Sequence, residues 1–84
     1  MGQYVVQLAA DRAGDVASIR ALIEEALTAA GLRLRQELTT TDGYRIDVLA
    51  DAAAGDEAIE MALAAVRRQP VPPLEWKVTG LTLP

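Results

Sequence analysis

The sequence predicts an α+β domain in which a four-stranded antiparallel sheet packs against two helices on one face. Four segments alternate apolar and polar residues with a period of two, which is typical of half-buried strands. Two other segments repeat apolar residues at spacings of three and four, which is typical of amphipathic helices. Along the chain these segments follow the order β-α-β-β-α-β.

Size and composition indicate one small globular unit. The 84 residues form a single domain, residues 1–84, and 51% of them are hydrophobic, too many for a disordered chain. A domain of this size buries only about 60–65% of the surface of its unfolded chain. We therefore expect it to gain stability from close packing or from a partner.

The first strand and the first helix are predicted over residues 3–8 and 15–30. Tyr4, Val6 and Leu8 share one face of the strand, and residues 11–14 end it. Asp15 is the expected N-cap of the helix, and Gly31 is the expected left-handed residue that closes it. The apolar stripe of this helix comprises Val16, Ile19, Leu22, Ile23, Ala26, Leu27 and Ala30.

Residues 32–51 are predicted to form a β-hairpin. Leu32, Leu34 and Leu38 alternate with charged residues before the turn. Tyr44, Ile46, Val48 and Ala50 do so after it. A two-residue turn at Asp42-Gly43 would set Glu37 opposite Val48 and would mix charges into the apolar face.

A three-residue loop, residues 41–43, gives the better hairpin register. It pairs Leu38 with Ile46 and Thr40 with Tyr44, so that both apolar sets share a face. Gly43 is then expected at positive φ, which glycine adopts without steric cost. On the outer face, this register sets Arg33 opposite Asp51 and Arg35 diagonal to Asp47.

The second helix and the last strand complete the pattern. Asp56 is the expected N-cap of the helix, and prolines at 70, 72 and 73 prevent its continuation. Residues 74–83 form the last strand, with Trp76 pointing inward. The expected buried stripe of the helix comprises Ile59, Ala62, Leu63 and Val66.

Right-handed crossovers for both β-α-β units place the two helices on the same face of the sheet. The result is the ferredoxin-like fold, with an expected strand order of 4-1-3-2. The strands that begin at Leu32 and Leu74 are then edge strands. The residues expected to meet in one core are Leu22, Ile23, Ile59, Leu63, Val6, Ile46 and Trp76.

Catalytic and metal sites are not predicted. The sequence has no His and no Cys, which removes the commonest general base, the commonest metal ligand and the thiolate nucleophile. The carboxylate pairs Glu24-Glu25 and Asp56-Glu57 are helix neighbours that point about 100° apart and cannot converge on a substrate. We therefore expect a non-enzyme without catalytic residues, metal or cofactor.

Nucleic acid and membrane are not the expected partners. The net charge is −4, and the arginines of the hairpin are interleaved with acids. The outward positions of the central strands lack the aromatic residues on which RNA-recognition motifs stack bases. No apolar run approaches the ~20 residues that span a bilayer. A cytoplasmic location is expected.

The loop after the first strand resembles the opening of ACT domains, small regulatory modules with this fold. Asp11, Arg12 and Gly14 match the Asp-Arg-Pro-Gly pattern of that family, and Ala13 replaces its proline. The resemblance covers residues 3–50. It implies that Asp11 and Gly14 help to bind an amino acid or another small carboxylate at a dimer interface.

The outward face of the sheet is the expected interface with a protein partner or with a second copy of the chain. It mixes charges of both signs with apolar side chains, a pattern that can be self-complementary across a two-fold axis. The candidate residues are Val5, Arg33, Arg35, Arg45, Asp47 and Leu49. The sequence thus favours a non-catalytic adaptor that uses its sheet face or edge, with an ACT-like metabolite sensor as the alternative.

Overall fold

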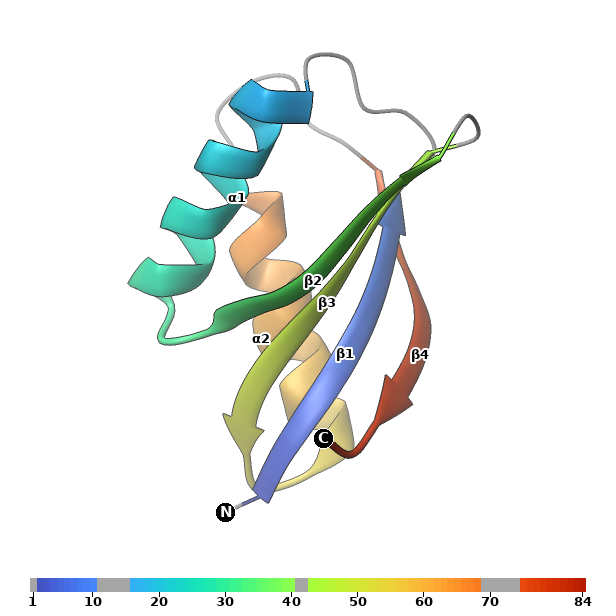
Figure 1. The fold of residues 1–84 in the computed structure, drawn as a ribbon. Helices are drawn as coiled ribbons and strands as arrows, with labels where there is room; N and C mark the ends of the chain where they lie inside the picture. Colours follow the sequence, from blue (N-terminus) through green and yellow to red (C-terminus); the bar gives the residue numbers. More distant parts are fainter. Residues whose placement is uncertain (1, 11–15, 41–42, 69–74) are drawn as a thin grey trace.

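The computed structural model of the chain describes residues 2–10, 16–40, 43–68 and 75–84. Six elements follow the predicted order of an α+β fold (Figure 1). They are β1 (Gly2–Ala10), α1 (Val16–Ala29), β2 (Arg33–Thr40), β3 (Gly43–Ala52), α2 (Gly55–Arg67) and β4 (Trp76–Thr82).

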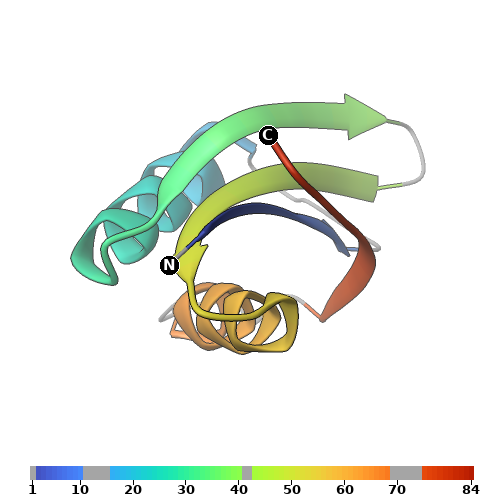
Figure 2. The ribbon, with the colours of Figure 1, turned by 90° about the horizontal axis from the view of Figure 1, so that it is seen from below.

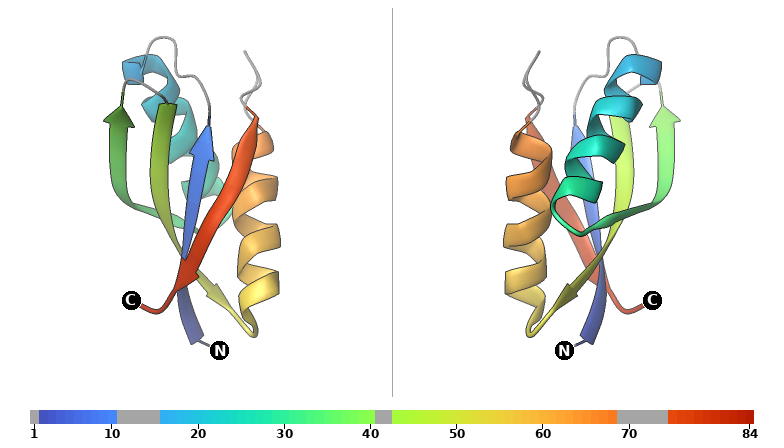
Figure 3. Two further views of the ribbon diagram at one scale, coloured as in Figure 1. Left: turned by 90° about the vertical axis from the view of Figure 1, so that its right-hand side faces the viewer. Right: turned by 90° about the vertical axis from the view of Figure 1, so that its left-hand side faces the viewer.

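All four strands form one antiparallel sheet in the order β2-β3-β1-β4, which is 4-1-3-2 when read from the β4 edge. The two central strands pair along their whole length, from Gly2 with Ala52 to Ala10 with Tyr44. Helix α1 contacts α2 and β2, whereas α2 contacts β1, β3 and β4. Both helices lie on the same side of the curved sheet (Figures 2 and 3).

A single hydrophobic core fills the space between the sheet and the helices. Of the residues expected there, Val6, Ile23, Ile46 and Trp76 are buried, and Ile59 and Leu63 pack against them while partly buried. The expectation for Leu22 is wrong, because this residue is only partly buried and lies outside the cluster. Helix α1 instead directs Ile23 and Leu27, one turn apart, into the core.

Alanines dominate the buried side of α2. Ala58, Ala62, Ala65 and Val66 are its buried residues, so the buried stripe is rotated from the predicted one and leaves Ile59 and Leu63 at its margin. Small side chains allow a helix to lie close to a sheet. The predicted cap is also wrong, since Ala54 precedes the helix and makes no side-chain cap hydrogen bond, whereas Asp56 stands in the first turn.

The end of α1 confirms the prediction for Gly31. This glycine has φ +77° and is the only residue at positive φ among those the structure describes. The amide of Leu32 donates to the carbonyl of Leu27 at 2.8 Å, and that of Gly31 donates to Thr28 at 3.0 Å. These two bonds form a Schellman motif that satisfies the last carbonyls of the helix. The predicted N-cap of α1, Asp15, lies outside the described residues.

The hairpin register differs from the predicted one. Thr40 pairs with Gly43, and Glu37 pairs with Ile46, so the connection is two residues long and Gly43 lies in the strand without positive φ. The register then shifts between Leu34 and Gln36, which leaves Arg35 as a bulge in β2. This extra residue reverses the alternation, so Leu34 faces the helices whereas Leu38 faces away from them. The expected pairs of Arg33 with Asp51 and of Leu38 with Ile46 are therefore wrong.

Candidate functional site

The side of the sheet without helices, called the open face below, brings together the predicted interface residues. The left panel of Figure 3 shows the four strands of this face in front of α1. Its residues form three rows that cross all four strands and one shorter row, in which Asp51 of β3 pairs with Gln3 of β1. The three long rows are Arg33, Leu49, Val5 and Thr82; Gln36, Asp47, Gln7 and Gly80; and Leu38, Arg45, Ala9 and Lys77.

Apolar side chains lie near the middle of the open face. Val5 is only 4% exposed although no helix covers it, and its neighbour Leu49 is partly buried. Arg35, the unpaired residue of β2, is exposed. The predicted diagonal of Arg35 with Asp47 is wrong, because Arg35 is skipped in the register and Gln36 pairs with Asp47.

Leu38 is an addition to the predicted interface. It is 51% exposed and stands beside Arg45 on the open face. The sequence pattern placed it inward, because Leu32, Leu34 and Leu38 share one parity. The one signal of the bulge was Gln36, a polar residue at an apparently inward position between Leu34 and Leu38.

A shallow hollow of about 200 Å³ lies among the second and third rows. Its lining comprises Gln7, Leu8, Gln36, Glu37, Leu38, Arg45, Asp47 and Thr79. Pockets for drug-sized ligands usually measure about 300–1,000 Å³. The hollow is therefore better suited to a single side chain of a partner than to a cofactor.

Both edge strands of the sheet are irregular. Strand β2 has the bulge at Arg35, and the pairing of β4 with β1 skips Thr79. The Thr79 hydroxyl donates a hydrogen bond to the carbonyl of Gln7 at 3.2 Å. Bulges twist a strand and interrupt its row of free backbone groups. The glycine that follows, Gly80, leaves room for the Gln7 side chain, which a Cβ at this position would meet.

A second polar cluster joins α1 to the hairpin on the helix side of the sheet. The Tyr44 hydroxyl donates a short hydrogen bond to Glu37 Oε2, and Arg20 Nη1 lies 3.2 Å from Glu37 Oε1. Arg20 also pairs with Glu24 at 3.2 Å within α1. Burial, followed by the hydrogen bond to Glu37 and the charge of that carboxylate, raises the pKa of Tyr44 well above its ordinary value. The phenol is therefore a proton donor that stays neutral, not a base, and the cluster serves to hold α1 against the sheet.

The remaining predictions concern the loop after β1, metals and membranes. The ACT-like candidates Asp11 and Gly14 lie outside the described residues, so no distance tests the metabolite site. Within the described ranges, no three acidic side chains gather closely enough to hold a metal ion. In the same ranges, neither helix is long and apolar enough to cross a membrane.

Comparison of the sequence with protein-family models and with curated proteins identifies no relative. No protein-family model matches the sequence. No curated protein matches it either.

Proposed function

We propose that this chain is a non-catalytic docking module of the ferredoxin-like class that holds a protein partner on its open face. The element order and the strand order 4-1-3-2 read from β4 support the fold class. The absence of His and Cys from the sequence, together with the neutral, hydrogen-bonded Tyr44, supports a role without acid–base or nucleophilic chemistry.

One observation carries the proposal: a helix-free face with an apolar centre and a mixed-charge margin. Val5 and Leu49 lie near the centre, with Arg33 in their row. Leu38 projects half exposed two rows away, in the row of Arg45 and Lys77. Protein interfaces have this anatomy of an apolar core with a polar rim, and arginine is enriched in them.

The face is favoured over the edges because of the two bulges. Strand addition needs a regular row of free amides and carbonyls, and the irregularities at Arg35 and Thr79 interrupt both edge strands. A partner that approaches the face meets side chains instead, and it can place one of its own in the hollow beside Arg45.

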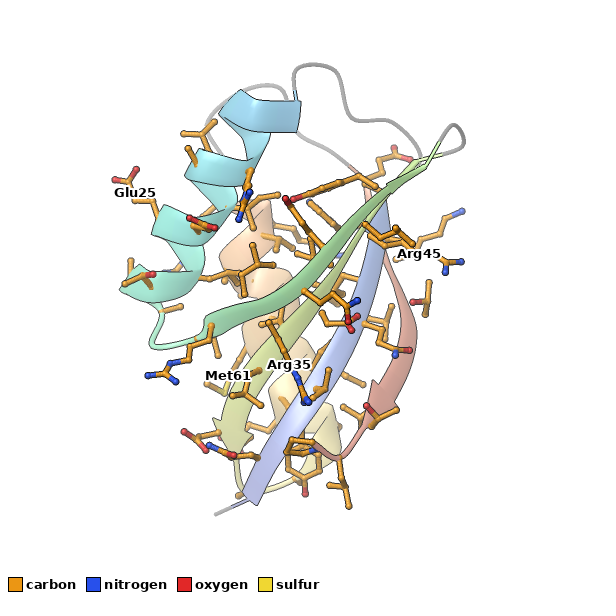
Figure 4. All side chains as sticks on the ribbon, in the orientation of Figure 1. Glu25, Arg35, Arg45 and Met61 are labelled. Atoms are coloured by element: carbon orange, nitrogen blue, oxygen red, sulfur yellow. The ribbon has the colours of Figure 1, made fainter. Side chains whose placement is uncertain are left out.

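Site-specific photo-crosslinking in the source cells tests the proposal. A crosslinking residue replaces Leu38 on the open face in one variant and Glu25 in the other. Glu25 is a matched control because it is exposed on α1 and points away from the molecule (Figure 4). Both substitutions are at surface positions, where the fold tolerates change.

We expect the Leu38 variant to form a discrete protein adduct, either with itself or with another chain, and the Glu25 variant to form none. The adduct should disappear when Leu49→Glu places a charge at the centre of the face. A discrete adduct from Glu25 with none from Leu38 would overturn the proposal.

A further inference from the structure

The outward residues of β3 carry an ordered set of charges. Arg45, Asp47, Leu49 and Asp51 follow one another on the open face, and the two end residues, Arg45 and Asp51, are exposed. Lys77 shares a row with Arg45, whereas Gln3 is the neighbour of Asp51. The exposed ends of this series on β3 are therefore basic at Arg45 and acidic at Asp51, about 20 Å apart.

This polarity distinguishes between two ways of stacking two copies face to face. If the two-fold axis ran along the strands, each row would face itself, and Arg45 and Lys77 of both copies would crowd at one end. If the axis crosses the strands, the rows are exchanged and the basic end of one copy meets the acidic end of the other. Like charges in contact oppose association, so the second arrangement is favoured.

We propose that the partner is a second copy of this chain, related by a two-fold axis that crosses β3 between Asp47 and Leu49. Arg45 of each copy then lies opposite Asp51 of the other, and the contact occurs twice because the interface is isologous. The inference rests on the proposed docking function and names its occupant.

The other rows are compatible with this axis. Arg33 stands opposite Gln36 of the second copy, with that copy's Asp47 diagonal to it, so a further pair of opposite charges forms on each side. Val5 and Leu49 lie next to the axis and face Gln7 and Asp47 of the second copy. A face four strands wide, with neighbouring strands about 4.8 Å apart, and about 20 Å long contributes about 400 Å² from each copy. This is below the roughly 1,200–2,000 Å² of a standard interface, so we expect a weak, reversible dimer.

Charge reversal with complementation tests the arrangement. Sedimentation equilibrium is measured on the wild-type chain, on Arg45→Asp, on Asp51→Arg, on a mixture of the two variants and on the double variant. Arg67→Asp, at the end of α2 and away from the open face, is the control for Arg45→Asp, because both change the net charge by the same amount. The fluorescence of the buried Trp76 establishes first that each variant is folded, so that a failure to complement reports on the contact and not on the fold.

We expect each single variant to dimerise at least about tenfold more weakly than the wild-type chain, since two attractive contacts become repulsive. The mixture and the double variant should regain most of the wild-type affinity, and Arg67→Asp should change little. A wild-type chain that stays monomeric at about 1 mM, or single variants that do not complement each other, would overturn the inference. If the Leu38 crosslinker then captures a different protein, the docking function stands and only the second copy is excluded.

Discussion

At the scale of single residues, Glu37 shows how a charged group is held on the inner side of a sheet. One oxygen of its carboxylate accepts a hydrogen bond from the Tyr44 hydroxyl, and the other forms an ion pair with the Arg20 guanidinium. The Glu37 side chain is 23% exposed, so loss of either partner leaves a partly desolvated charge. The protonation of Tyr44 depends in turn on Glu37, because both burial and the nearby carboxylate disfavour the phenolate and so raise the pKa of Tyr44.

Tyr44→Phe should lower the free energy of unfolding by about 1–3 kcal/mol near pH 8, the usual value for a hydrogen bond to a charged group. The pKa of Tyr44 is higher in the folded than in the unfolded protein. Its contribution to stability is therefore complete below about pH 10 and declines as the pH rises further, because the unfolded chain then loses the proton first. Urea unfolding between about pH 8 and pH 11 should show the difference between the two proteins shrinking at the alkaline end. A difference that stays constant across this range would contradict the role assigned to the phenol.

Which site residues could be predicted depends on the strand that carries them. Val5, Arg45, Asp47 and Leu49 belong to the central strands, where the alternation is unbroken, and all four were placed correctly on the outer face. Leu38 and Glu37 follow the Arg35 bulge, and their sides of the sheet are the reverse of the predicted ones. The predicted register gathers apolar residues on one face and does not account for a Glu37 carboxylate that Tyr44 and Arg20 pair with on the helix side.

At the scale of elements, the Arg35 bulge sets the orientation of half of the hairpin. Before it, Leu34 pairs with Val48 on the helix side; after it, Leu38 pairs with Arg45 on the open face. A bulge adds a single unpaired residue to one of the two strands. The residue types on either side of it give little indication of where this extra residue lies. Helix ends were easier to predict where glycine has a conformational role, as at Gly31. The start of α2 was harder to predict, because several neighbouring residues compete for the N-cap position.

Two alanine substitutions distinguish the observed register from the predicted one. Leu34→Ala removes a partly buried side chain that packs against the core and should cost about 1–3 kcal/mol of unfolding free energy. Leu38→Ala removes a side chain that is 51% exposed and should cost less than about 0.5 kcal/mol in the monomer. Chemical denaturation at low protein concentration measures both. Equal losses would favour the three-residue loop, in which both leucines face inward.

At the scale of the whole molecule, the topology could be predicted because general rules leave few choices. The order of the elements and the handedness of the crossovers lead to the strand order 4-1-3-2, which matches the observed neighbours. The depth of each core residue could not be predicted in the same way. Ala58, Ala62 and Ala65 are the buried positions of α2 together with Val66, whereas the larger Ile59 and Leu63 are only partly covered.

The two helices should therefore respond differently to the same substitution. Leu27→Ala in α1 empties a fully buried position and should cost about 2–5 kcal/mol, whereas Leu63→Ala in α2 should cost about 1–2 kcal/mol. A chain of this length has about 4–13 kcal/mol of total stability, so the first change is a large fraction of it. Thermal and urea unfolding of the two variants provide the comparison. A larger loss for Leu63 than for Leu27 would show that α2 packs with its predicted stripe inward.

The position of Trp76 makes the protein its own optical probe. It is the one tryptophan of the sequence, 6% exposed on the helix side, with its ring 6.1 Å from that of Tyr44 in an edge-on contact. The ring packs in the hydrophobic core, and its indole nitrogen makes no hydrogen bond with the described residues. Its fluorescence should be blue-shifted in the native protein, should receive energy from Tyr44, and should move to longer wavelength on unfolding. Because the ring lies on the other side of the sheet from the open face, this signal reports folding while remaining insensitive to whatever binds there.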